Sequence, residues 1–173
     1  MSIAPVSTPE RPESATTAAG KYLLFRLGRE EYGIAVLKVR EIIGQHEIAE
    51  VPNTPPFVKG VINLRGKVIP IIDLRLKLGL EAETTDRNCT VVVQIEGQSN
   101  QILAGVIVDE VREVVNISAS EIEPTPDFGR GQDREYILGI AKIASGVRIL
   151  LDTDKVLAPQ EWQMSAGGAA TLS

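Results

Sequence analysis

The stretch Gly33-Ile-Ala-Val-Leu-Lys-Val-Arg-Glu-Ile-Ile43 decides the fold, because a close copy of it occurs later in the chain. Written without gaps, it aligns with Gly105-Val-Ile-Val-Asp-Glu-Val-Arg-Glu-Val-Val115. The glycine, two valines, the arginine and the glutamate are identical, and several other positions exchange isoleucine for valine. A repeat of this kind indicates that two parts of the chain share one order of structural elements.

The alignment extends outward on both sides of this stretch. Phe57-Val-Lys-Gly60 matches Tyr136-Ile-Leu-Gly139, and the same register pairs Asp73 with Asp152. Upstream, residues 22–27 correspond to residues 90–95. We therefore predict two similar β-barrels, one from residues 21–86 and one from residues 87–158, with strands that can be exchanged between them. Each half is below the size that usually holds a core alone, so we expect a common hydrophobic seam.

Short Val- and Ile-rich runs on either side of tight turns predict the strands of these barrels. The expected strands are residues 22–27, 31–36, 58–64, 67–74, 90–95, 101–108, 136–144 and 147–151. Helical signals are few and short, at residues 36–43, 74–80 and 152–157. The fold class is therefore mostly β, with two five-stranded barrels and a few short helices.

Composition excludes several classes of function. The net charge is −5 and no cluster of Lys and Arg forms a basic stripe, so nucleic-acid binding is not expected. No apolar run approaches the roughly 20 residues that a membrane helix needs, so direct membrane insertion is not expected. One cysteine, Cys89, fits a reducing compartment, and we expect a cytoplasmic protein.

The two ends of the chain are predicted to be tails. Residues 1–20 are rich in Ser, Thr, Pro and Ala, without the apolar core of a secretion signal, and we expect them to be disordered. Residues 159–173 are rich in Gly, Ala and Ser toward the end. Trp162 indicates that the start of this second tail docks on the body of the protein.

The residues that could carry chemistry do not add up to an active site. His46 is the only histidine and Cys89 the only cysteine, so neither a metal site nor a Cys–His couple is expected. Cys89 heads an apolar run and is interpreted as a small core residue. Asp73 and Asp152 occupy equivalent repeat positions and are expected to be N-caps of short helices. We predict no enzyme, no cofactor and no metal.

Features that the two halves do not share are candidates for function. Asn63-Leu64-Arg65-Gly66 is matched in the second half by Lys142-Ile-Ala-Ser145, so an arginine stands where the copy has an alanine. Arginine can bind a carboxylate through two parallel hydrogen bonds, although a solvated turn arginine is an equal alternative. The Pro-rich connection 48–57 is a second unshared feature, which either presents a partner surface or closes a barrel end.

In order and spacing, these motifs resemble the CheW family of chemotaxis adaptors. The resemblance is carried by residues 30–34, 37–42, 53–61, 63–66 and 70–75, and in the second half by 105–109 and 122–124. It covers residues 21–157 and implies two SH3-like five-stranded barrels. It also implies a non-catalytic scaffold that joins the cytoplasmic tip helices of methyl-accepting chemoreceptors to the regulatory domain of the histidine kinase CheA, at membrane-associated receptor arrays.

The resemblance also implies which residues act. The expected receptor-binding residues lie in a groove between the barrels and are Val39, Glu41, Ile42, Gly60, Asn63 and Arg65. Glu41 and Arg65 are expected to form an ion pair, and Val111 and Val114 match positions implicated in coupling or on the kinase side.

Three alternatives remain beside this interpretation. The first is a CheW-like adaptor of another CheA-like kinase, in twitching motility or biofilm control, which the motifs do not distinguish. The second is a CheV protein, for which too little chain follows residue 157 to form a receiver domain. The third is an enzyme on a small β-barrel, which would need convergent titratable groups in a pocket.

Overall fold

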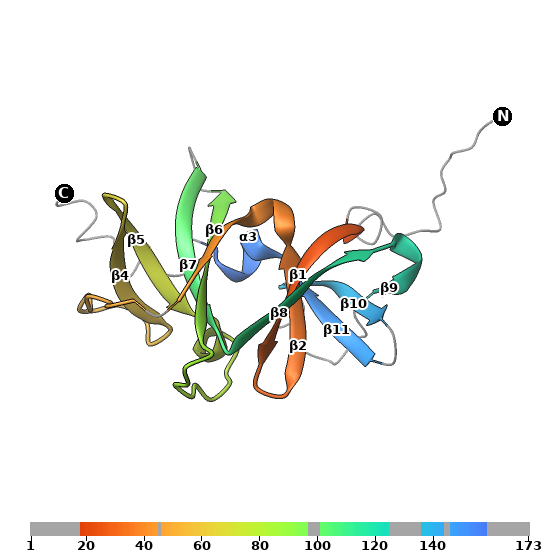
Figure 1. Cartoon of the computed structure of the whole chain (residues 1–173), viewed down its shortest axis with the longest axis horizontal. Helices are drawn as coiled ribbons and strands as arrows, with labels where there is room; N and C mark the ends of the chain where they lie inside the picture. The colour runs from red at the N-terminus through yellow and green to blue at the C-terminus, as the bar shows by residue number, and fades with distance from the viewer. Residues whose placement is uncertain (1–17, 45, 97–100, 125–135, 144–145, 159–173) are drawn as a thin grey trace.

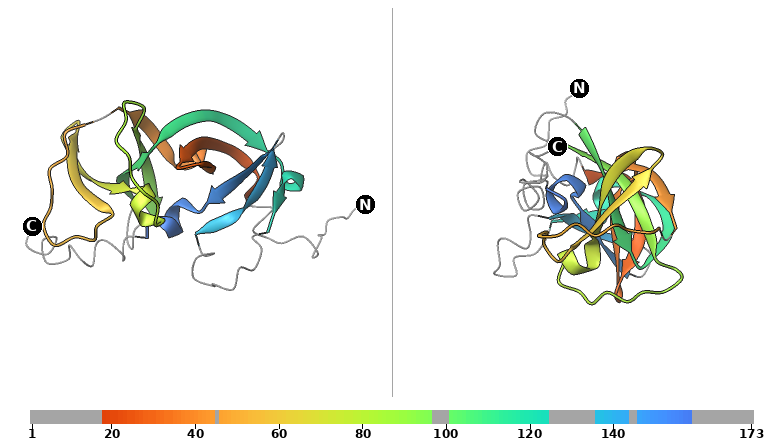
Figure 2. Two further views of the ribbon diagram at one scale, coloured as in Figure 1. Left: turned by 90° about the horizontal axis from the view of Figure 1, so that it is seen from below. Right: turned by 90° about the vertical axis from the view of Figure 1, so that its left-hand side faces the viewer.

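The computed structural model describes residues 18–44, 46–96, 101–124, 136–143 and 146–158. Two curled sheets lie side by side along the long axis of the molecule (Figure 1). Seen from below, each sheet curves around its own end of the molecule (Figure 2). The prediction of a mostly β chain with two small sheets and few helices is confirmed.

The six-stranded sheet, sheet A, has the strand order β8-β1-β2-β11-β10-β9. Its strands are β1 (Gly20–Leu27), β2 (Glu30–Ala35), β8 (Glu110–Ile117), β9 (Ile122–Glu123), β10 (Ile137–Ile143) and β11 (Gly146–Leu151). Two of these strands, β8 and β9, are absent from the predicted set, and β9 is a two-residue segment that pairs with β10.

The five-stranded sheet, sheet B, has the strand order β3-β6-β7-β5-β4. Its strands are β3 (Val39–Ile43), β4 (Val58–Leu64), β5 (Lys67–Asp73), β6 (Cys89–Glu96) and β7 (Gln101–Val108). Each sheet therefore contains strands from both halves of the sequence, because β1 and β2 pair within sheet A while β6 and β7 pair within sheet B.

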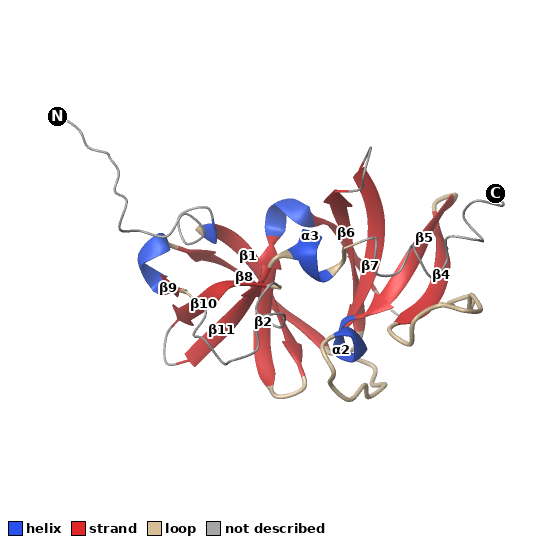
Figure 3. Ribbon diagram, turned by 180° about the vertical axis from the view of Figure 1, so that it is seen from behind, coloured by secondary structure: helices blue, strands red, loops and turns tan. Residues whose placement is uncertain are grey.

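Among the described residues, three short helices connect strands and a fourth follows the last strand. They are η2 (Val36–Lys38), α2 (Leu74–Lys77), η3 (Ala119–Glu121) and α3 (Thr153–Val156). Figure 3 shows α2 and α3 on the back of the molecule, near the junction of the two sheets. The expected caps are confirmed, since the Asp73 carboxylate accepts from Arg75 N at 3.0 Å and that of Asp152 from Lys155 N at 3.2 Å.

One helical prediction is wrong. Residues 36–43 form a single 3-10 turn followed by the strand β3. The apolar residues Val36, Val39 and Ile43 have a helix-like spacing, but pairing with β6 determines the backbone: Val39 lies opposite Val93 and Ile43 opposite Thr90. A bulge between Val39 and Glu41 hides the alternation expected of a strand.

The internal repeat has a clear structural meaning. Asp73 N donates to Phe57 O at 2.7 Å, and the equivalent Asp152 N donates to Tyr136 O at the same distance. The repeated glycines lie at the only parallel pairings described, Gly33 opposite Leu150 and Gly105 opposite Ile71. The two halves thus follow the same path, each supplying a hairpin to the other half's sheet.

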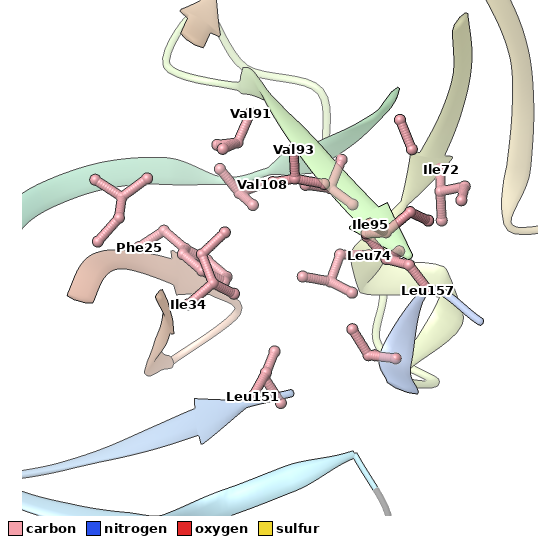
Figure 4. Close-up of a cluster of buried hydrophobic side chains, with 14 of the residues drawn as sticks. Phe25, Ile34, Ile72, Leu74, Val91, Val93, Ile95, Val108, Leu151 and Leu157 are labelled. Carbon is pink, nitrogen blue, oxygen red and sulfur yellow. The ribbon is translucent and has the colours of Figure 1, made fainter. Parts of the chain in front are cut away.

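The core has three parts. A central cluster lies between the sheets, and it includes Phe25, Ile34, Val91, Val93 and Leu151 (Figure 4). An inner cluster lies against the concave side of each sheet: Tyr22 and Leu24 belong to that of sheet A, and Ile71 and Val92 to that of sheet B. The predicted hydrophobic seam is the central cluster.

The packed part of the chain begins before the first strand. Ala18 is buried in the inner cluster of sheet A, and its carbonyl accepts a hydrogen bond from the Tyr22 hydroxyl. Burial, assisted by the negative charge of Asp152, raises the pKa of Tyr22 to about 12. Residues 1–17 and 159–173, most of the predicted tails, lie outside the described residues.

Gly105→Ala tests the close approach of strands at the repeat glycine. An added Cβ would lie 2.6 Å from Ile71 Cδ1 and 2.7 Å from Thr90 Cγ2, inside the inner cluster of sheet B. Overpacking of this kind costs about 1–3 kcal/mol, which urea unfolding would measure. Gly44→Ala is the control, because nothing lies within 4 Å of its added Cβ. Equal stability of the two variants would contradict the packing described here.

Candidate functional site

An ion pair connects the two edges of sheet B. Nη1 of Arg65 donates to Glu41 Oε1 at 2.5 Å, and Nη2 donates to Oε2 at 2.9 Å. Glu41 belongs to edge strand β3, and Arg65 lies in the turn that leaves the other edge strand, β4. The predicted pair is confirmed, with the two parallel hydrogen bonds that arginine and carboxylate geometry favours.

The turn holds Arg65 in a fixed position. Arg65 and Gly66 have φ values of 53° and 87°, so both occupy the left-handed region that two-residue hairpin turns require. Asn63 Oδ1 accepts from Gly66 N at 2.8 Å and closes the turn. The Arg65 side chain is 72% exposed, so its remaining surface is free for contact with another molecule.

The pair also sets the charge state of Glu41. The hydrogen bond from Arg65 lowers the pKa of the Glu41 carboxyl, and this outweighs the opposing effect of burial. The positive charges of Arg65 and His46 lower it further. Glu41 in turn raises the pKa of the Arg65 guanidinium through the same hydrogen bond. Both groups are therefore charged across the physiological range.

Four of the predicted apolar site residues flank the central cluster on two edge strands. On β3, Val39 and Ile42 lie opposite Val93 and Val91 of the cluster. On β8, Val111 and Val114 lie opposite Phe25 and Leu23 of the same cluster. Val39 and Val111 pack against the cluster, whereas Ile42 is 44% exposed and Val114 is 55% exposed. Leu37, which the sequence reasoning did not select, is 87% exposed at the start of this edge.

Gly60 differs from the other predicted site residues because it offers no side chain to a partner. It is buried, its φ is 143°, and an added Cβ would lie 2.0 Å from Ala49 O. Ala49 forms two backbone hydrogen bonds with Val61, each 2.9 Å long. Gly60 thus allows Ala49, in the segment after β3, to pair with β4. This contact links the two edge strands of sheet B.

Sequence reasoning missed a buried charge network at the junction of the two sheets. The Arg75 side chain is 4% exposed; its Nε and Nη2 donate to Asp73 at 2.9 and 3.0 Å, and its Nη1 donates to Asp109 at 2.8 Å. Gly28 N also donates to Asp109, at 2.6 Å. Burial disfavours the charged form of Arg75, but the hydrogen bonds to the two aspartates outweigh it and raise its pKa. Arg75 contacts both aspartates, and Arg26 Nη1 lies 4.0 Å from Asp109, so each buried charge has a partner of opposite sign and the network is structural.

His46 and Cys89 line the same cavity, of about 270 Å³, at one end of sheet B. Lys59, Asp73 and Arg75 also line it. His46 is exposed, with Nδ1 3.3 Å from Gly44 O, and Cys89 is half-buried rather than fully in the core. Among the described residues, no group of three or more His, Cys, Asp or Glu side chains is placed to hold a metal ion.

Comparison with known proteins gives a consistent result. The model of the CheW-like domain family matches residues 21–161. The chain is 41% identical over 145 residues to the chemotaxis protein CheW of Klebsiella aerogenes, covering 84% of this chain and 86% of that one. It is 33% identical over 147 residues to the chemotaxis protein CheW of Rhizobium meliloti, covering 84% and 92%.

A solved structure agrees with these relatives. The crystal structure of the scaffolding protein TtCheW from Thermoanaerobacter tengcongensis superposes with a TM-score of 0.69 at 36% identity, covering 78% of this chain and 89% of that one. In the part of the chain that the structure describes, no helix is long and apolar enough to span a membrane.

Arg65→Ala tests the electrostatic role of the ion pair. Without its partner, the Glu41 carboxyl is expected to regain a pKa near the ordinary value, measured by carbon NMR of that carboxyl during a pH titration. Because the folded-state pKa of Glu41 is depressed, any stability from the pair is present above the unfolded pKa and is lost as pH falls through the folded pKa. An unchanged pKa in Arg65→Ala would show that the pair does not persist in solution.

Arg75→Met tests the buried network. The substitution leaves Asp73 and Asp109 buried without their partner, which costs roughly 3–5 kcal/mol of unfolding free energy. Urea denaturation at neutral pH measures the loss. Arg87→Met is the control, because the Arg87 side chain is 70% exposed and its change is expected to stay within about 0.5 kcal/mol. Similar losses in the two variants would refute the structural role of the network.

Proposed function

Because the chain belongs to the CheW-like domain family, we propose that it is a non-catalytic adaptor coupling the cytoplasmic tip helices of methyl-accepting chemoreceptors to the histidine kinase CheA. The relatives named above are chemotaxis proteins, and the similar solved structure is of a scaffolding protein. The observation that carries the proposal is the bidentate Glu41–Arg65 pair beside the exposed Ile42 of β3.

The receptor-binding surface in this proposal follows the edge of the central cluster. It consists of Val39, Glu41, Ile42, Gly60, Asn63 and Arg65. Val111 and Val114, on the edge strand β8 of sheet A, are proposed to act in coupling or on the kinase side. An exposed apolar side chain such as Ile42 can accept the anchors of an amphipathic helix, which recur at a spacing of three and four residues. The charge pair at one side supplies polar contacts that fix the position of the helix.

The members of this set act in different ways. The exposed Arg65, Ile42 and Val114 can touch a partner directly. Glu41 orients Arg65, and Asn63 closes the turn that carries it. Gly60 holds the edge of sheet B together and acts only through the backbone. Substitutions at Gly60 are therefore proposed to impair binding by moving other residues.

The kinase side of the proposal rests on the two-sheet body. The regulatory domain of CheA is proposed to bind at the ends of the sheets, away from the receptor-binding surface, and the protein is proposed to work in the cytoplasm at receptor arrays. Several weak contacts on one rigid body give a strong assembly through effective concentration. Val111 and Val114 are the residues proposed for coupling or for the kinase side.

Reconstituted kinase activity tests the coupling. Receptor tip fragments and CheA are mixed with or without the protein, and CheA autophosphorylation is measured. The protein is expected to stimulate the kinase only when the receptor is present, and Arg65→Ala is expected to lower the stimulation about tenfold through loss of a charge-assisted contact. Arg87→Ala, an equally exposed arginine, is the matched control and is expected to behave as the wild type.

A double-mutant cycle separates the pair from general surface charge. Glu41→Arg and Arg65→Glu are each expected to weaken coupling, and the combined variant is expected to recover part of it because the pair re-forms with opposite polarity. Strict additivity would refute the pairing. If the folded wild-type protein fails to stimulate the kinase with chemoreceptor tips, the protein serves a different CheA-like pathway, such as twitching motility or biofilm control.

A further inference from the structure

An apolar strip on the outer face of sheet B is buried at one end, at Ile72, and exposed at the other, at Val68, in the part of the chain that the structure describes. Along β5, Ile69 and Ile71 point into the inner cluster, whereas Ile72 points the other way, into the central cluster. Because side chains alternate along a strand, Val68 and Pro70 share the outward face with Ile72. Val68 is 69% exposed, so the central cluster continues along this strand as an exposed apolar surface.

The strip borders a cavity of about 380 Å³ between β5 and β7. Val68 and Pro70 form one wall and Ile102 the other, and Ile102 also packs against the central cluster. Lys67 stands at the rim. The cavity is thus lined mainly by apolar side chains, together with Gln101 and the positively charged Lys67.

The chain leaves the described structure close to this strip. Helix α3 is joined to the end of β6 by a hydrogen bond from Glu96 N to Asp154 Oδ1, 3.0 Å long. Glu96 lies opposite Gln101, the residue before Ile102 in the next strand. After α3, Leu157 is buried beside Leu74 and Ile95 (Figure 4), and Ala158 is the last residue described.

We propose that the segment after Ala158 covers this strip, with the Trp162 indole in the cavity lined by Val68, Pro70 and Ile102. Trp162 is the fourth residue after Ala158, an extended reach of about 13 Å. The strip between Ile72 and Val68 also spans four residues of a strand, about 13 Å. A large aromatic ring suits an apolar cavity, and the preceding Glu161 carries the charge that complements Lys67.

Trp162 is the only tryptophan, so its fluorescence reports on this contact directly. In the full-length wild type, the emission is expected to be blue-shifted and protected from acrylamide relative to the urea-unfolded chain. Val68→Asp places a charge in the cavity and is expected to shift the emission to the red and to raise quenching. Val147→Asp is the matched control, because Val147 is 51% exposed on β11 of sheet A and should leave the emission unchanged.

Far-UV circular dichroism of both variants shows whether the sheets are intact, so that unfolding is not mistaken for undocking. A solvent-exposed emission in the folded wild type would overturn the proposal. So would an equal response to Val68→Asp and Val147→Asp. In either case the strip is left as a surface for a separate protein chain, and concentration-dependent association of the wild type would identify that chain as a second copy.

Discussion

The structure depends on the burial of two strands on both faces. Along β6, Val91 and Val93 enter the central cluster while Val92 enters the inner cluster of sheet B, and all three are fully buried. Along β1, Leu23 and Phe25 enter the central cluster while Leu24 enters the inner cluster of sheet A. Residues 22–27 and 90–95 are the aligned repeat segments, so one apolar run, used twice, builds all three parts of the core.

The charged residues at the junction of the two sheets form ion pairs. The two halves of the chain form these pairs with different residues. Arg75 in α2 pairs with Asp109 after β7. At the equivalent position of α3 the charge is reversed, because Asp154 accepts from Lys38 of η2 at 2.7 Å. In each pair, one partner lies in the helix after a parallel strand, α2 after β5 or α3 after β11. The other partner lies in a connection between the two sheets, β7 to β8 or β2 to β3. The helix position is the same in both halves but its charge is reversed, and the partners are not repeat equivalents, because Asp109 aligns with Leu37.

Local sequence predicted the hairpins, the caps and the central cluster, because each depends on neighbouring residues or on alternation within one strand. It failed at β3 and did not predict β8 or β9. The apolar residues of β3 have the spacing of a helix, and the segment is a strand because it pairs with β6. Strand β9 is only two residues long, too short to give a sequence pattern. Among the site residues, the contact between Glu41 and Arg65 was expected from the family resemblance and is present. The Arg75 network was not predicted, because the partner residue Asp109 is distant in sequence. The available signal was the charged Arg75 at the junction between a strand and a helix.

The exchange of hairpins between the halves has a consequence for how the protein forms. Strand β1 pairs with β8, far along the chain, and β5 pairs with β7 only after β6 has been made. Neither sheet can be completed while the chain is still half synthesised, and closing such distant loops costs entropy before the contacts repay it. All strands of sheet B have been made once β7 is synthesised, whereas sheet A needs β11, so a nascent chain exposes part of the apolar run of β1 until the last strands have emerged.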